Sequence, residues 1–268
     1  MGNVSPVVVV GAASGIGAEV LDRYVKRGAD VYALDYVKPA TDQATYIECD
    51  LRDADSISAA AAALPSDIAA IAHVAGIPGT RPDDQVLAVN FLGLRQFLRL
   101  AVPKVRPGGA VTVVASTAGA MWLARQADTA PLLATTSIAE GLQWLADNPS
   151  DYATYNLSKE ATITFITRWS SAVWREHQVR LNTVSPGPVE TAILGDFEES
   201  MGKELLDGVR ALVGRHATPA DIAPVIEAVS GPDFGWMIGH DLQLDAGFVA
   251  SMMTGGAELP SGLPTEHV

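Results

Sequence analysis

The chain has 268 residues, of which 48% are hydrophobic, with 24 glycines and a net charge of −13. This size and composition are typical of one α/β domain spanning residues 1–268, and the acidity argues against nucleic acid or an anionic membrane as a partner. Cys49 is the only cysteine and is expected to be packed inside. No apolar stretch approaches the ~20 residues of a membrane span, and the first strand begins at Val7, so we expect a cytoplasmic protein.

A β-branched run, a glycine-rich turn and a helical pattern follow one another at the start of the chain. Residues 7–10 form the run, and residues 18–27 the helix. This succession is typical of a turn that cradles a pyrophosphate at a helix N-terminus. The cofactor-binding residues predicted in this stretch are Gly11, Ser14, Gly15, Ile16 and Gly17.

The second strand, residues 31–34, ends in Asp35, about 20 residues after the glycine turn. A carboxylate there accepts hydrogen bonds from an adenosine ribose and repels a 2′-phosphate. No arginine or lysine within the turn offsets that repulsion, and Tyr36 follows Asp35. The sequence therefore predicts NAD rather than NADP as the cofactor.

Strands and helices continue to alternate, with little room for a helix before the third strand at 46–49. Asp50 and Leu51 follow it and are candidates for contact with the adenine, although Asp50 alternatively starts the next turn. Ser56 is expected to cap a helix at 57–64, and a fourth strand at 68–74 leads into Ala75 and Gly76. The alternation predicts a parallel sheet with ligands beyond its C-terminal edge.

The second half supplies the candidate catalytic residues. A helical pattern at 84–105 contains Asn90, whose buried amide needs partners, and a fifth strand at 110–115 ends at Ser116. Tyr155 and Lys159 lie four residues apart on one face of the next helix, where the ammonium is expected to lower the pKa of the phenol. A sixth strand at 179–184 precedes Pro186, Gly187, Val189 and Thr191, and the seventh is placed at 241–244.

In this order, the glycine turn, Asp35, the asparagine helix, Ser116, Y-x-x-x-K and P-G-x-x-x-T resemble the short-chain dehydrogenase/reductase family over residues 5–250. The resemblance implies a Rossmann-type three-layer sandwich around a doubly wound, mostly parallel seven-stranded sheet. It also implies a homodimer or homotetramer.

The resemblance implies a role for each catalytic residue. Tyr155 is the acid/base, Ser116 positions the substrate oxygen, and Lys159 lowers the tyrosine pKa and binds the nicotinamide ribose. Asn90 holds a water that links Lys159 to solvent. Val189 and Thr191 hold the carboxamide.

Several segments depart from the family pattern. His73 replaces an asparagine and is expected to be a packed core residue. Ser116 and Tyr155 are 155 − 116 = 39 positions apart, much more than usual. Residues 117–150 are read as an insertion with one helical run at 131–146, similar to bacterial 3α-hydroxysteroid dehydrogenase/carbonyl reductases. It is expected to cover the pocket or alter the oligomer surface, or to be a surface elaboration.

The expected function is hydride transfer between NAD and a secondary alcohol or ketone, on an apolar cyclic, aromatic or steroid-like substrate. Residues 190–215 are read as a substrate lid and 249–268 as a tail. The alternatives are a 3-oxoacyl-carrier-protein reductase, disfavoured by the acidity of the chain, and a non-catalytic dinucleotide-sensing regulator. No metal is expected, because the five histidines lack ligand spacing.

Overall fold

A computed structural model describes residues 5–191, 210 and 214–254. The structure is built on one sheet of seven parallel strands in the order β3-β2-β1-β4-β5-β6-β7. This confirms the predicted fold class. The strands are β1 (Val7–Val10), β2 (Val31–Asp35), β3 (Thr45–Glu48), β4 (Ile68–His73), β5 (Val105–Val114), β6 (Arg180–Pro186) and β7 (Asp241–Leu244).

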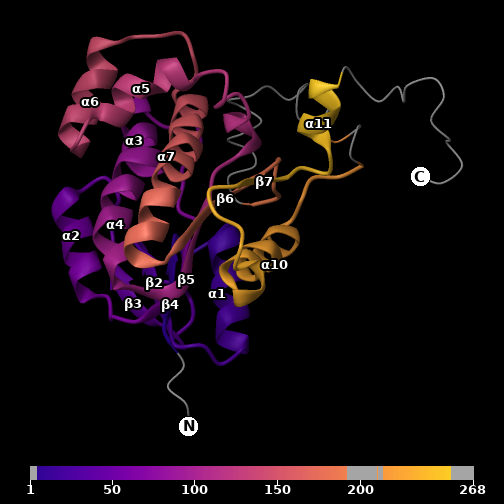
Figure 1. Cartoon of the computed structure of the whole chain (residues 1–268). Helices are drawn as coiled ribbons and strands as arrows, with labels where there is room; N and C mark the ends of the chain where they lie inside the picture. The colour runs from indigo at the N-terminus through magenta and orange to yellow at the C-terminus, as the bar shows by residue number, and fades with distance from the viewer. Residues whose placement is uncertain (1–4, 192–209, 211–213, 255–268) are drawn as a thin grey trace, which may run out of the picture.

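Helices cover both faces of this sheet (Figure 1). One face carries α1 (Gly15–Lys26) and α10 (Pro219–Ser230), and the other carries α2 (Ala54–Ala63), α4 (Leu94–Ala101) and α7 (Thr154–His177). Alternate side chains of a strand point to opposite faces. Thus Val8 and Val10 join the core under α4 and α7, while Val7 and Val9 join the core under α1 and α10.

The connection after β4 forms one long helical stretch, Asp83–Lys104, rather than a uniform α-helix. It consists of α3 (Asp83–Leu87), a π-helical segment (Ala88–Gly93), α4 and a short 3-10 turn. By length and composition this stretch could cross a membrane, which corrects our expectation that no segment is long enough. Because 78% of its apolar window is buried in the protein, it has the character of a core helix.

The start of α2 differs from the prediction. Asp53, not Ser56, caps the helix, and its carboxylate accepts a hydrogen bond from the backbone nitrogen of Asp55 at 2.9 Å. The Ser56 hydroxyl instead accepts a hydrogen bond from the Asp50 nitrogen at 2.9 Å. Both residue types can cap a helix, and the path of the chain out of β3 decides between them.

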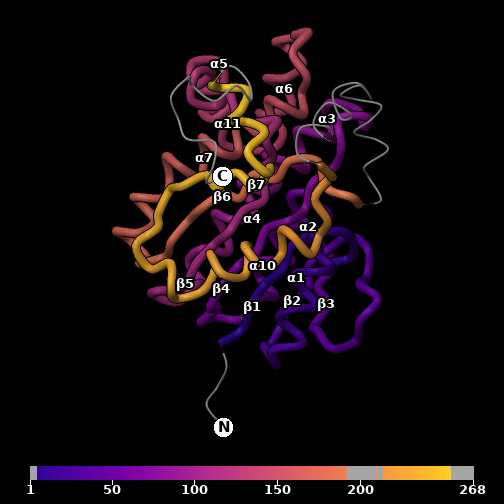
Figure 2. The backbone as a smooth tube through the Cα atoms, turned by 90° about the vertical axis from the view of Figure 1, so that its right-hand side faces the viewer, coloured from indigo at the N-terminus to yellow at the C-terminus, as the bar shows by residue number. Residues whose placement is uncertain are grey.

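The insertion contains two helices, α5 (Gln126–Ala134) and α6 (Ile138–Asp147), where one helical run was predicted. The Thr135 hydroxyl donates back to the Leu132 carbonyl, and Ser137 caps α6 by accepting from the Glu140 nitrogen. These local hydrogen bonds compete with helix continuation and produce the break. Both helices lie at the end of the molecule where α7 begins, opposite the N-terminus (Figures 1 and 2).

The remaining α-helix among the described residues, α11 (Phe248–Met253), follows β7, and short 3-10 helices span Thr117–Gly119 and Pro232–Phe234. Most of the expected lid at 190–215 and the tail from residue 255 lie outside the described residues.

The contact between the π-helical segment and the end of β3 yields a stability prediction. A methyl group on Gly93 would lie 2.0 Å from the Leu51 carbonyl oxygen, so the backbone would have to move. We expect Gly93→Ala to lower the free energy of unfolding by about 1–3 kcal/mol, measured by urea denaturation. Gly235→Ala is the control, because its nearest neighbour would be 3.4 Å away and the change should stay within about 0.5 kcal/mol. Equal losses in both variants would contradict the packing argument.

Candidate active site

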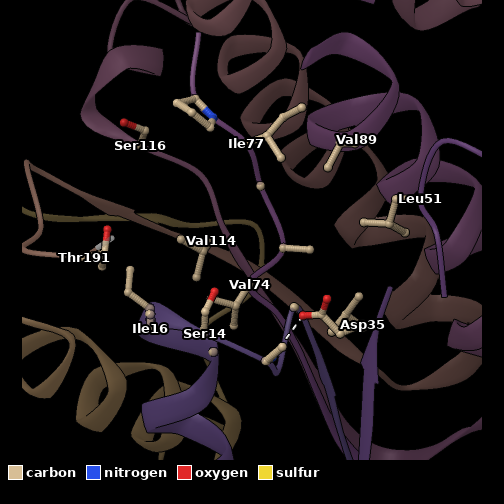
Figure 3. A pocket seen from close by; sticks show the side chains of 18 of the residues that line it. Ser14, Ile16, Asp35, Leu51, Val74, Ile77, Val89, Val114, Ser116 and Thr191 are labelled. Carbon is tan, nitrogen blue, oxygen red and sulfur yellow. Dashed lines mark hydrogen bonds between the residues drawn. The ribbon is translucent and has the colours of Figure 1, made fainter. Parts of the chain in front are cut away.

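A cavity of about 650 Å³ lies beyond the C-terminal ends of the central strands (Figure 3). Its size is that of a site for a small molecule or cofactor. All the predicted site residues except Asn90 line it, although they come from seven separate stretches of the chain. They are Gly11, Ser14, Gly15, Ile16, Gly17, Asp35, Asp50, Leu51, Ala75, Gly76, Ser116, Tyr155, Lys159, Pro186, Gly187, Val189 and Thr191.

The glycine turn brings backbone segments too close together for side chains. A methyl group on Gly11 would lie 2.5 Å from the Ala75 nitrogen, and one on Gly17 would lie 1.9 Å from the Gly11 carbonyl oxygen. Gly11 also has a φ of +84°, which favours glycine. The turn therefore brings β1, the start of α1 and the end of β4 into contact at the floor of the cavity.

The first turn of α1 forms the part of the cavity suited to a phosphate. Ser14 occupies the N-cap position, and its hydroxyl makes no capping hydrogen bond. The N–H groups at a helix N-terminus lack partners within the helix and carry partial positive charge, which attracts anions. Gly15 adds no side chain here, and a methyl group on it would come within 3.4 Å of the Thr191 methyl group. The residues present thus fit a pyrophosphate.

Asp35 lies at one end of the cavity and Ser116 at the other (Figure 3). Each carboxylate oxygen of Asp35 accepts one backbone hydrogen bond, from Ala13 at 3.0 Å and from Val37 at 3.1 Å. These bonds fix the carboxylate. A carboxylate oxygen has more than one acceptor position, so each can also accept a ribose hydroxyl.

Sequence reasoning missed a cation on the same cavity. Arg52 lines it and forms a salt bridge with Asp50, with 2.6 Å between Nη2 and Oδ2 and 2.9 Å between Nε and Oδ1. This partner lowers the pKa of Asp50. The expectation that nothing offsets the Asp35 charge was based on the glycine turn and on Tyr36 after Asp35, and Arg52 lies outside both. The Arg52 charge is largely neutralised by Asp50.

Other cavity residues also escaped prediction. The polar ones are Tyr36, Arg81, Gln85 and Thr117, and the apolar ones include Val74, Ile77, Val89 and Val114. Tyr36 and Thr117 directly follow predicted site residues, so their position in the sequence was a usable signal. Arg81, Gln85 and Val89 are placed by the path from β4 into α3, which no local pattern reports.

Ser116, Tyr155 and Lys159 come together at the end of the cavity opposite Asp35. Tyr155 is hydrogen-bonded to Ser116 through their side chains. The Lys159 Nζ lies 5.5 Å from the centroid of the Tyr155 ring, and Lys159 is buried. A hydroxyl pair beside an ammonium can hold a substrate oxygen and exchange a proton with it.

The electrostatics of this cluster differ from the expectation that Lys159 lowers the tyrosine pKa. Burial raises the pKa of Tyr155 to about 12, and the hydrogen bond with Ser116 opposes this rise. Burial also lowers the pKa of Lys159 to about 8, so the ammonium is readily lost. Desolvation disfavours the charged form of both side chains.

Asn90 lies beneath this cluster rather than on the cavity wall. Its carboxamide bonds the backbone of Ile77 in both directions, at 2.8 Å to the nitrogen and 3.0 Å to the carbonyl oxygen. The backbone carbonyl oxygen of Asn90 accepts a hydrogen bond from the Thr162 hydroxyl at 3.0 Å. A methyl group on Gly76 would lie 3.3 Å from both the Asn90 Oδ1 and the Lys159 Nζ. Asn90 thus fixes the chain that follows β4 beside Lys159. Its role in holding a water that links Lys159 to solvent stays a prediction.

His73 is a buried core residue, as expected from its place in a strand. The ring is fully buried at 5.9 Å from that of Phe97, and neither ring nitrogen has a hydrogen-bond partner within the described residues. Burial lowers its pKa to about 3, so the imidazole is neutral. No three histidine, cysteine, aspartate or glutamate side chains in the described part of the chain lie close enough to hold a metal.

The segment after β6 reaches back to the glycine turn. Gly187 donates to the Leu244 carbonyl oxygen at 3.0 Å, and Glu190 donates to that of Ala217 at 2.7 Å. These bonds hold residues 187–191 at the cavity edge, with Thr191 beside Gly15. The predicted carboxamide contacts of Val189 and Thr191 are compatible with this position and stay predictions.

Comparison with known proteins gives a family match over most of the chain. A family model described as "Enoyl-(Acyl carrier protein) reductase" matches residues 11–249. A coniferyl-alcohol dehydrogenase of Pseudomonas sp. (strain HR199 / DSM 7063) is 31% identical over 246 residues, which cover 91% of this chain and 96% of the relative.

One further relative and one solved structure of the same fold carry the hydroxysteroid name. A 3-alpha-hydroxysteroid dehydrogenase/carbonyl reductase of Comamonas testosteroni is 27% identical and covers 92% of this chain and 98% of its own. The solved 3-alpha-hydroxysteroid dehydrogenase of Pseudomonas sp. B-0831, complexed with NADH, has a TM-score of 0.77 at 24% identity. It covers 95% of this chain and 100% of its own. The sequence match confirms the predicted resemblance, and the structural match supports the fold.

The burial of Lys159 predicts that the site destabilises the protein. Its pKa falls from the ordinary 10.5 to about 8, so between these pH values the unfolded chain binds the proton more tightly. The free energy of unfolding therefore rises with pH across this window, and the full penalty is present below pH 8. We expect Lys159→Met to be more stable than the wild type at pH 7, by on the order of 2 kcal/mol. This margin should shrink toward pH 10.5, as measured by urea denaturation at several pH values.

Lys26→Met is the control, because the Lys26 side chain is 73% exposed and pairs only with Asp22 on the surface. The Lys26→Met change should alter the free energy of unfolding only slightly at every pH. A Lys159→Met margin that is absent at pH 7, or that grows with pH, would contradict the desolvation argument.

Proposed function

Since the chain belongs to the short-chain dehydrogenase/reductase family, we propose that it transfers hydride between NAD(H) and an alcohol–carbonyl pair on an apolar, ring-bearing substrate. One observation carries this proposal. A single cavity has a fixed carboxylate at one end, a helix N-terminus at its floor and the Ser116–Tyr155–Lys159 cluster at the other end. That order matches the adenosine, pyrophosphate and nicotinamide ends of a dinucleotide.

The cofactor would be held by residues from four segments of the chain. Asp35 would bind the adenosine ribose, the first turn of α1 the pyrophosphate, and Lys159 the nicotinamide ribose, with Val189 and Thr191 toward the carboxamide. When bound, a nicotinamide cofactor supplies hydride chemistry at the carbinol carbon. The negative charge of Asp35 favours NAD, because the Arg52 cation is already paired with Asp50.

Tyr155 would exchange the proton with the substrate oxygen. With a pKa raised to about 12, the neutral phenol dominates at neutral pH and suits proton donation to a carbonyl oxygen. Alcohol oxidation needs the phenolate, so its rate should rise with pH. Ser116 would hold the same oxygen by a hydrogen bond, and the Lys159 ammonium would favour the phenolate when proton removal is required.

Apolar side chains support an apolar substrate. Ile77, Val89 and Val114 line the cavity. Outside its lining, in the turn after Ser116, Met121 and Leu123 expose 57% and 67% of their surface, an uncommon position for two large hydrophobic residues. The 31% identity to a coniferyl-alcohol dehydrogenase favours an aromatic alcohol, and the 27% identity to a hydroxysteroid dehydrogenase makes a steroid the next substrate to test. Assays of both classes, with a sugar alcohol as a polar comparison, test the substrate class.

A carrier-protein substrate is less well supported, although the family model bears such a name. An acidic carrier requires a basic docking surface, and the chain has a net charge of −13. A non-catalytic regulator would need no serine–tyrosine–lysine cluster, and all three residues are present together. Absence of NADH formation or consumption across the alcohol and carbonyl panel would favour the regulator.

The proposed acid/base role predicts the effect of removing one oxygen atom. Tyr155→Phe should lower kcat/KM by roughly 10²–10⁴-fold while leaving NADH binding near normal, because only the proton-transfer group is lost. Steady-state kinetics and NADH fluorescence titration measure the two properties. Tyr24→Phe is the matched control, since burial also raises the pKa of Tyr24 to about 12, far from the cavity. Near-normal activity of Tyr155→Phe would remove this residue from the mechanism.

The proposed NAD preference predicts the effect of removing the Asp35 charge. Asp35→Asn should lower kcat/KM for NAD by roughly 10- to 100-fold and reduce the discrimination against NADP, because a charged acceptor for the ribose hydroxyls is lost. Kinetics with both cofactors measure the ratio. Asp42→Asn, an exposed residue paired with Lys38, is the control. An unchanged NAD/NADP ratio in Asp35→Asn would overturn the assignment of this carboxylate.

A further inference from the structure

A buried carboxylate directly follows the lysine of the catalytic cluster. The Glu160 side chain is 0% exposed, and its neighbour Lys159 is 5% exposed. Burying a charge is costly unless it is paired and hydrogen-bonded. The role of Glu160 therefore depends on what neutralises it.

The insertion and the segment before α7 supply both partners of Glu160. Arg125 donates from Nε to Glu160 Oε2 at 3.1 Å, and the Tyr152 hydroxyl donates to Oε1 at 2.6 Å. The Arg125 guanidinium also lies over the Tyr152 ring, 3.8 Å from its centroid. Both carboxylate oxygens are thus satisfied by side chains from outside α7.

Backbone contacts also tie the segment after Ser116 to α7. A methyl group on Gly119 would lie 3.0 Å from the Lys159 carbonyl carbon and 3.2 Å from the Glu160 nitrogen, so this turn rests on the helix backbone beside Lys159. The turn continues to Arg125, whose backbone nitrogen donates to the Met121 carbonyl oxygen at 3.0 Å. The chain between Ser116 and Arg125 is therefore held on α7 at both ends.

We infer that Arg125 is a positioning residue. Through Glu160 and Tyr152 it fixes the Ser116 segment against the start of α7, and it neutralises a buried negative charge next to Lys159. This assignment rests on the proposed function for its effect on catalysis. It gives the insertion before α7 a specific task, since Arg125 belongs to that insertion.

The electrostatic part of the assignment predicts shifts of opposite sign. Without Arg125 an unneutralised carboxylate remains near Lys159 and Tyr155, which favours their protonated forms. Without the Glu160 charge an unneutralised guanidinium remains, which favours their deprotonated forms. The charged and titratable groups around Glu160 are Arg125 and Asp128 from the insertion, Tyr152 before α7, and Lys159 and Tyr155 on α7, with His73 on β4 facing Lys159.

The test measures kcat/KM for alcohol oxidation against pH. In Arg125→Met the acidic limb of the profile should move to higher pH, and in Glu160→Gln to lower pH, each by at least a few tenths of a pH unit. The double variant should return close to the wild type. Arg125→Lys keeps the charge and should keep the limb in place, and it provides a folded variant if Arg125→Met unfolds. Tyr152→Phe should weaken the positioning, and so lower kcat, with little shift of the limb.

A second ion pair of a buried glutamate, far from the cavity, provides a control. Arg23 and Glu227 join α1 to α10 at 2.8 Å, with side chains 29% and 6% exposed, against 28% and 0% for Arg125 and Glu160. Arg23→Met should lower the melting temperature by less than Arg125→Met, because Arg27 also pairs with Glu227, and it should leave the pH profile unmoved. Shifts of the same sign in both Glu160→Gln and Arg125→Met, no shift in either, or an equal shift in Arg23→Met would overturn the assignment.

A readout without turnover separates this assignment from the proposed function. The pKa of Lys159 can be followed by NMR of ¹³C-labelled lysine, with its signal identified by its loss in Lys159→Met. The pKa of Lys159 should rise in Arg125→Met and fall in Glu160→Gln. If no alcohol is oxidised by the wild type, the proposed function fails, and the titration alone supports or overturns the role of Arg125.

Discussion

The site depends on keeping a lysine ammonium out of water beside a tyrosine. Lys159 is buried near the C-terminal edge of the sheet, where burial lowers its pKa to about 8. Tyr155 beside it is half-buried on the cavity wall, and burial raises its pKa to about 12. Loss of hydration destabilises both the ammonium and the phenolate there, so small changes in nearby charge have large effects on proton exchange. The two hydrophobic cores on either side of the sheet provide the stability that allows such a cluster to persist.

The surrounding structure places fixed dipoles and paired charges around this cluster. Asn90 bonds the backbone of Ile77 from a π-helical segment, an irregularity common near functional sites. Glu160 is neutralised from two directions by side chains outside its own helix. Most of the charge near Lys159 is therefore compensated locally, which leaves the ammonium and the phenol as the groups able to respond to a ligand.

Local patterns predicted the elements well where a single physical cause acts. The strand, glycine turn and helix at the start of the chain are dictated by β-branched residues and by the absence of side chains at Gly11 and Gly17. Prediction failed where two choices were locally equivalent. Asp53 and Ser56 can both cap α2, and the helical run after Pro131 breaks at Thr135 because hydroxyls there bond the backbone. Burial, which raises the pKa of Tyr155, is also not visible in a helical spacing.

By itself the sequence determined the alternation of strands and helices, and the identity of the residues at each strand end. These follow from periodicity and from the side chains, which are local properties. Only the tertiary structure decided that Arg52 pairs with Asp50 on the cavity wall, and that Arg125 reaches a carboxylate 160 − 125 = 35 positions later. Such pairings depend on how distant segments pack, and packing also sets the desolvation that shifts the pKa of Tyr155 and Lys159. The spacing of Tyr155 and Lys159 thus indicated the chemistry, while the fold set the charge states with which it begins.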